Sequence, residues 1–148
     1  FRRVLFRSVG IPNDNSQDDG KVKIMLPLSD VPVFVNEINR HIYPTGGGSE
    51  PSLDAIFFIA DRRNPLGLNW TPNYARALLL FTDESQQSYA SPPVTEITAM
   101  NMVTTNNISV FIFTNDFSWN NWRTYPLFST ADILSKNIQE AIDKGMCQ

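Results

Sequence analysis

The sequence ALLLFTDE at residues 77–84 constrains the fold more than any other part of the chain, because an unbroken apolar run there gives way to an acidic residue. A run this short and this apolar, preceded by the turn-forming sequence WTPN at 70–73, predicts a β-strand buried on both faces. Strands of that kind occur in parallel sheets that helices cover on both sides. We therefore expect an α/β fold with residues 77–82 as a central strand.

The acidic residue after this run is Asp83. Open parallel sheets bind ligands beyond the carboxyl ends of their strands, so a carboxylate at this position is a candidate functional group. A side chain at the same place can instead cap the turn that follows, and Asp83 and Ser85 both have suitable oxygen atoms. The position alone leaves both interpretations open.

Further segments continue the pattern of alternating strands and helices. A half-buried edge strand is predicted at 22–28, a buried strand, ISVFIF, at 108–113, and a short strand within 122–127. Strands that alternate with helices predict a three-layer α/β sandwich. Its sheet is expected to be mostly parallel and Rossmann-like, with helices on both faces.

Four helices are predicted from capping residues and apolar periodicity. They run from Ser29 or Asp30 to about residue 43, from Ser49 or Glu50 to Ala60, from Ser91 to Asn106, and from Thr130 to about Lys144. Gly145 is expected to stop the last helix. Ile97 in the third helix and Ile133 in the fourth are expected to face the core.

Residues 1–8, FRRVLFRS, match a translation of the tail of a common sequencing-library adapter. We therefore expect them to be a scar outside the fold, and we expect the domain to have lost its first strands upstream. A genuine N-terminal strand is the alternative. Residues 9–20 are polar and rich in turn formers, which predicts a loop or disordered lead-in to a domain at 21–148.

The charge of the chain argues against nucleic acid as a partner. Twelve Lys and Arg stand against fifteen Asp and Glu, a net charge of −3, which becomes −6 without the three arginines of residues 1–8. Binding to phosphate backbones needs clustered basic residues. No apolar stretch reaches the roughly 18–20 residues of a membrane span. His41 and Cys147 are the only histidine and cysteine, and neither predicts a metal site or a catalytic pair.

A second informative segment, GGGSEPSLDAIFFIA at 46–60, combines three glycines, an acidic residue and a helix start. Together with residues 77–84, it resembles the von Willebrand factor A family, and especially the integrin-β-like branch. The matching pieces, in chain order, are the glycines at 46–48, Glu50, Asp54 with Ala55, Trp70, and the strand that ends in Asp83. The resemblance extends from Val22 to Lys144.

The resemblance implies a metal site at the carboxyl ends of the strands. In the family, Mg²⁺, or else Mn²⁺ or Ca²⁺, binds there and accepts a carboxylate from a partner protein. Asp83 and Glu50 are the implied ligands, with Ser49 and Thr45 as further candidates. The family's D-x-S-x-S motif is absent from this chain and would precede Lys21. Because such ions need about six oxygen ligands, we expect weak binding at best.

The loop TNDFSWNNW, at 114–122 after the second buried strand, brings an acid and three aromatic residues together. Asp116 and Trp119 are candidate partner-binding residues if this loop forms an exposed recognition surface. The alternative is that the aromatic rings belong to the core.

The leading functional expectation is a protein-binding or adhesion module, outside the cell or at its surface, and not an enzyme. A structural domain with a degenerate metal site is an alternative, favoured if Glu50 and Asp83 point into different regions of the fold. A doubly wound metal-dependent hydrolase is another, with Asp83 or Asp116 as nucleophile or metal ligand. Against it, the chain has no phosphate loop and no nucleophile elbow.

Overall fold

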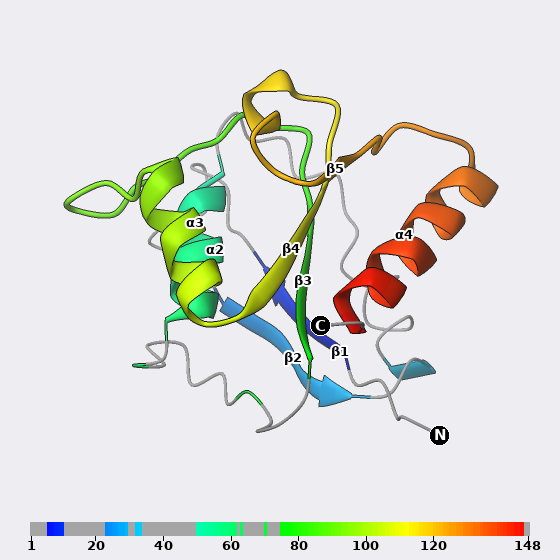
Figure 1. The fold of residues 1–148 in the computed structure, drawn as a ribbon, viewed down its shortest axis with the longest axis horizontal. Coiled ribbons are helices and arrows are strands. Elements are labelled where there is room, and N and C mark those ends of the chain that lie inside the picture. The colour runs from blue at the N-terminus through cyan, green and yellow to red at the C-terminus, as the bar shows by residue number, and fades with distance from the viewer. Residues whose placement is uncertain are drawn as a thin grey trace.

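The computed structural model describes residues 32–33, 50–61, 63, 70 and 75–145 with their side chains, and residues 6–10, 23–29 and 146 by their backbone alone. Three strands form one sheet: β3 (Arg76–Phe81), β4 (Ile108–Phe113) and β5 (Thr124–Tyr125). Figure 1 shows the helices α2 (Ser52–Ala60) and α3 (Glu96–Thr105) on one side of this sheet and α4 (Ala131–Met146) on the other. The predicted α/β fold, with helices on both faces, is confirmed.

The sheet is parallel throughout its described strands. β3 pairs with β4 from Arg76 opposite Ile108 to Phe81 opposite Phe113, and β4 pairs with β5 in the same direction. The strand predicted at 108–113 has those bounds, and the strand predicted at 77–82 begins and ends one residue earlier. Because the register is unshifted, both long strands end at the same edge of the sheet.

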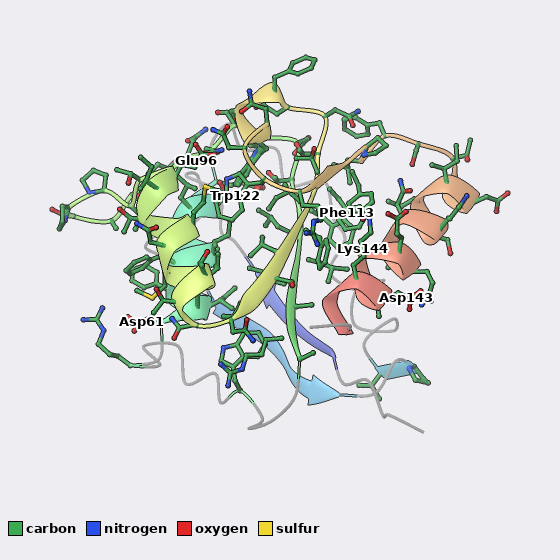
Figure 2. All side chains as sticks on the ribbon, viewed as in Figure 1. Asp61, Glu96, Phe113, Trp122, Asp143 and Lys144 are labelled. Carbon is green, nitrogen blue, oxygen red and sulfur yellow. The ribbon has the colours of Figure 1, made fainter. Side chains whose placement is uncertain are left out.

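Each face of the sheet packs against its own layer of helices. Leu80 and Ile112 join a buried cluster with residues of α2 and α3, including Ile56 and Ala99. The alternate residues Phe111 and Phe113 are fully buried on the opposite face, with Ala141 of α4. Figure 2 shows Phe113 on that side of the sheet, toward the end of α4 that carries Lys144. The strand β4 is therefore buried on both faces, as its apolar sequence predicts. The same prediction is wrong for β3, which lies at the edge of the described three-stranded sheet: Leu80 is its one buried residue and Phe81 is 44% exposed, because β3 pairs with β4 alone among the described strands.

An aromatic stack crosses the three strands on the α4 face. The rings of Phe81 and Phe113 are stacked with centroids 4.6 Å apart, and those of Phe113 and Tyr125 with centroids 5.2 Å apart. Such cross-strand pairs stabilise a sheet beyond the area that they bury. The stack fixes the ends of the strands next to the edge where a ligand would bind.

Two helices begin later than predicted. The helix α2 starts at Ser52 rather than Ser49 or Glu50, and α3 starts at Glu96 rather than near Ser91. Pro93 disfavours helical backbone at the residue before it, and Thr95 caps α3 by accepting the N–H of Thr98 at 3.2 Å.

The orientation of α3 also differs from prediction, as the exposure of Ile97 shows. The buried face of this helix is set by Ala99 and Val103, four residues apart, so Ile97 points away from it and is 70% exposed. The prediction that Ile97 faces the core is wrong.

The helix α4 presents Leu134, Ile138 and Ala141 to the sheet as its periodicity predicts, but it departs from prediction at Ile133 and at Gly145. Ile133 was expected in the core but is 50% exposed, because Leu134, Ile138 and Ala141 form the face toward the sheet. Gly145 does not stop the helix, which continues to Met146. Instead, a Cβ at Gly145 would lie 2.8 Å from the Cβ of Ala77 and 3.3 Å from Cε2 of Phe111. The glycine lets the last turn of α4 approach β3 closely.

The N-terminal part of the chain contributes a separate pair of strands. The strand β1 (Phe6–Gly10) pairs antiparallel with β2 (Lys23–Ser29). Residues 9 and 10 are thus in a strand and not in the predicted loop. The backbone N–H and C=O groups at the edge of β2 are available to pair with an extended segment, and Val9 and Gly10 lie opposite Ile24 and Lys23. This pairing leaves the origin of residues 1–8 untested. The predicted edge strand at 22–28 corresponds to β2.

Some predictions concern parts of the chain that lie outside the described residues. They include most of the helix expected from residue 30 to 43, with His41, and Cys147. Pro32 and Val33 are described and are helical. Among the helices that the structure describes, none combines the length and the apolar character needed to cross a membrane.

We expect Gly145→Ala to lower the free energy of unfolding, by up to about 2 kcal/mol. Alanine favours a helix by about 1 kcal/mol over glycine, but overpacking against a sheet typically costs about 1–3 kcal/mol. Urea unfolding followed by circular dichroism measures the change.

The double variant Ala77→Gly, Gly145→Ala is the control, because it removes the methyl group that the new Cβ would meet. The two substitutions should be less damaging together than the sum of their single effects. Additive effects, or a stabilising Gly145→Ala, would contradict the close approach.

Candidate functional site

The carboxyl ends of β3 and β4 are built in the same way. Thr82 and Thr114 extend the sheet by one residue, since the N–H of Thr82 donates to Phe113 O at 3.1 Å and that of Thr114 to Tyr125 O at 2.9 Å. Both threonines are buried. Each hydroxyl oxygen then accepts the N–H two residues ahead, from Glu84 and Asp116 respectively, at 3.1 Å. These bonds turn the chain immediately after each strand.

Thr82 also connects the end of β3 to the segment before α2. Its hydroxyl donates to Oε2 of Glu50 at 3.5 Å, which is the outer limit of a hydrogen bond. Glu50 is half-buried there. We refer to Glu50, Thr82, Asp83 and Glu84 as the strand-end site.

Glu50 lies in an environment that disfavours its charge. Partial burial, and then the negative charges of Asp83 and Glu84, raise the pKa of the Glu50 carboxyl above its usual value, while the bond from Thr82 acts in the opposite direction. Asp83 and Glu84 therefore lie close enough to Glu50 for their charges to act on its carboxylate. A bound cation would relieve this repulsion.

The structure brings together the two acidic residues that the sequence singles out. Asp83 is exposed at the end of β3, and its charge acts on Glu50. The turn after the strand is closed by Thr82 rather than by Asp83 or Ser85. Ser49 and Thr45, the further candidate ligands, lie outside the described residues, as do the glycines at 46–48.

The fit to a divalent cation is partial. Carboxylate and hydroxyl oxygens are the ligands that Mg²⁺ and Ca²⁺ prefer, and the strand-end site offers only such atoms. However, no group of three or more His, Cys, Asp or Glu side chains within the described residues is arranged to hold a metal ion. A cation at Glu50 and Asp83 would therefore take most of its ligands from water.

Asp116 occupies the matching position after β4, where it caps a short helix, η1 (Phe117–Trp119). Its Oδ1 accepts the N–H of Ser118 at 2.7 Å. The hydrogen bonds from Ser118 hold the pKa of the Asp116 carboxyl below its usual value. This carboxylate thus has a local structural partner, while it remains at the same edge of the sheet as Asp83.

Trp119 belongs to the core and not to an exposed recognition surface. It is fully buried, its Nε1 donates to Glu84 O at 2.9 Å, and its ring lies edge-to-face with Trp122 at 6.1 Å. A buried indole cannot contact a partner, so the core alternative holds for this residue. The aromatic residue that the loop does present to solvent is Phe117, which is 90% exposed.

Sequence reasoning missed the residues that hold the loops around this site. Asp54, in the first turn of α2, is only 4% exposed and accepts hydrogen bonds from residues 34 to 36 positions away. Gln86 donates to Ser118 O at 2.6 Å and to Glu96 Oε1 at 2.7 Å. Figure 2 shows Glu96, at the start of α3, on the same side of the sheet as Trp122. Such long-range polar contacts leave no periodic signal in a sequence.

Comparison with known proteins adds no assignment. A scan against protein-family models gives no match, and a search of curated proteins gives none either.

We expect Glu50→Gln to raise the free energy of unfolding at pH 7. A raised folded-state pKa means that the folded protein binds this proton more tightly than the unfolded chain, so stability falls as pH rises from the unfolded pKa through the folded one. Glutamine has no such charge and can still accept the bond from Thr82. The gain should shrink as the pH falls through the unfolded-state pKa and should disappear near about pH 3, where the carboxyl is protonated in both states; urea unfolding between about pH 3 and pH 7 measures it.

Glu140→Gln is the matched control because its effect has the opposite sign. A hydrogen bond from Lys144 lowers the pKa of the Glu140 carboxyl, so the charged form stabilises the fold above the unfolded pKa. Stability should fall in this variant at pH 7, and the difference should vanish in acid. A Glu50→Gln variant that is less stable than the parent at pH 7 would refute the crowding of charge at Glu50.

Proposed function

We propose that this chain is a protein-binding module of the von Willebrand factor A type, whose strand-end site binds a divalent cation that accepts a partner's carboxylate. The observation that carries the proposal is the hydrogen bond from Thr82, at the carboxyl end of β3, to Glu50, which brings Glu50 within reach of the charge of Asp83. Parallel sheets bind ligands at this edge. The proposal includes a location outside the cell or at its surface.

The electrostatics of the site support a cation rather than an anion. The pKa of Glu50 is raised first by partial burial and then by the negative charges of Asp83 and Glu84. The carboxylate oxygen atoms of these residues suit Mg²⁺, Mn²⁺ or Ca²⁺ better than softer metals. The charge of a bound cation would then make the acidic edge attractive to a partner's carboxylate.

The same geometry argues against the two alternative functions. A degenerate structural site is the better explanation if Glu50 and Asp83 point into different regions, whereas the charge of Asp83 reaches Glu50 at the end of β3. A hydrolase would need Asp116 or Asp83 beside a base, whereas Asp116 caps η1. Binding is therefore the function that the geometry supports best.

The rim of the site offers the partner a further contact. Phe117 projects from η1 directly after Asp116 and is almost fully exposed. Hydrogen bonds from Gln86 to Ser118 hold this turn against the loop that follows Asp83. An aromatic side chain on a fixed turn is a typical anchor in a protein interface. In the proposal, Phe117 and Asp116 take the place that the sequence suggested for Asp116 and Trp119.

We expect divalent cations to bind weakly, with a dissociation constant of about 1 mM or higher, because the chain supplies only a few of the ligands. A cation at ten times its dissociation constant raises the free energy of unfolding by about 1.4 kcal/mol. Urea unfolding with and without Mg²⁺, Mn²⁺ or Ca²⁺ measures this increment, and calorimetric titration checks it.

The increment should be lost in Glu50→Gln and in Asp83→Asn, each compared with its own metal-free stability. Asp143→Asn is the control, since Asp143 is an exposed acid near the end of α4 where Gly145 approaches Ala77, at the start of β3 and away from its carboxyl end. An increment that is absent from the folded parent, or equal in all variants, would sink the metal proposal.

A further inference from the structure

Asp54 is a buried acid whose oxygens are all directed at a distant loop. Its Oδ1 accepts from the hydroxyl of Ser88, and its Oδ2 accepts from the N–H groups of Tyr89 at 2.8 Å and Ala90 at 3.0 Å. A carboxylate that is only 4% exposed is costly unless such bonds satisfy it. The fold retains it at the start of α2, where it fixes the loop between β3 and α3.

Neighbouring residues of α2 hold the same loop. Gln87 O accepts the N–H of Leu53 at 3.0 Å, and Gln87 N donates to Ser52 Oγ at 3.4 Å. Ser88 links Asp54 to the segment before α3, since its hydroxyl oxygen also accepts the N–H of Val94 at 2.8 Å. Four consecutive loop residues, 87–90, are therefore hydrogen-bonded to the first turn of α2.

The other side of this loop holds the turn that follows β4. Glu84 O accepts the indole N–H of Trp119, and Gln86 donates both its backbone N–H and its side-chain amide to Ser118. The loop at 84–90 thus links α2 to η1. A displacement of Asp54 would therefore move the chain at the carboxyl ends of both β3 and β4.

We infer that Asp54 is the positioning residue of the carboxyl edge: it sets the loop at 84–90 relative to α2, and so sets Asp83 relative to Glu50 and η1. Glu50 and Asp54 both belong to the segment at 50–54, at the start of α2. Asp83 and the loop residues that bond to Asp54 both belong to the segment at 83–90, after β3. The role of this edge in metal binding rests on the proposed function, whereas the positioning itself does not.

The test compares Asp54→Ala, which removes both acceptor oxygens and so all three hydrogen bonds, with Asp54→Asn, which keeps one acceptor oxygen. Amide hydrogen exchange measured by NMR should become about tenfold faster at Tyr89, Ala90 and Val94 in Asp54→Ala, since each broken bond weakens local protection. The indole N–H of Trp119 should also exchange faster. The N–H of Ile112 in β4, which bonds to Arg123 O, reports global unfolding.

Asp54→Asn should restore part of the protection. Ser88→Ala gives a milder version of the same change if Asp54→Ala fails to fold, and Asp132→Ala is the control for loss of a first-turn acid. Equal acceleration at Ile112 and at the loop amides would overturn the inference, because Asp54 would then act on global stability alone. So would an unchanged exchange rate at the indole of Trp119.

The increase in the free energy of unfolding that a divalent cation produces, the cation increment, separates this inference from the proposed function. If the parent shows an increment, Asp54→Ala should reduce it several-fold while the acids of the site are intact. A retained increment together with faster loop exchange would overturn the positioning of Asp83. A parent without any increment would sink the metal proposal, and the exchange rates alone would then decide whether Asp54 positions the edge.

Discussion

The parallel pairing of β3 with β4 is the constraint on which the rest of the described structure depends. Its register places Phe81 opposite Phe113, so Thr82 and Thr114 follow side by side at one edge. Each threonine continues the ladder and then bonds forward to turn the chain. Since both strands end together, the loops that follow are forced to share one small region. The polar residues in those loops meet there.

Burial on both faces explains why this edge, and not a face of the sheet, is available for binding. Helices α2 and α3 cover one side, and α4 covers the other so closely that Gly145 lies against Ala77. The described faces are filled by apolar side chains. Polar chemistry is left to the strand ends, where backbone groups and short side chains are accessible.

Glu50 and Asp54 lie four residues apart and have contrasting environments. Asp54 is more deeply buried, yet its oxygens are satisfied by a hydroxyl and two backbone N–H groups. Within the part of the chain that the structure describes, the Glu50 carboxylate accepts one long bond, from Thr82, and the negative charges of Asp83 and Glu84 act on it. The Asp54 carboxylate holds the loop at 84–90 at the carboxyl edge of the sheet. The Glu50 carboxylate is left with the uncompensated charge that a cation or a basic group would match.

The sequence predicted the strongly patterned elements because their signals are local. The apolar runs at β3 and β4 were found to within a residue, and the order of strands and helices indicated the α/β class. Helix boundaries and faces were less accurate. Ile97, Ile133 and Gly145 were misjudged because the direction in which a helix rests on its neighbours is set by packing and not by periodicity alone.

The sequence by itself therefore determined the positions of β3 and β4, the acidic character of the chain and the placement of Asp83 at a strand end. Only the tertiary structure decided that Glu50 lies beside Asp83, that Trp119 is core while Phe117 is exposed, and that Asp54 holds the loop at 84–90. The physical reason is the range of the interactions. Apolar burial along a strand repeats every two residues, whereas the polar contacts at this edge join residues about 30 positions apart.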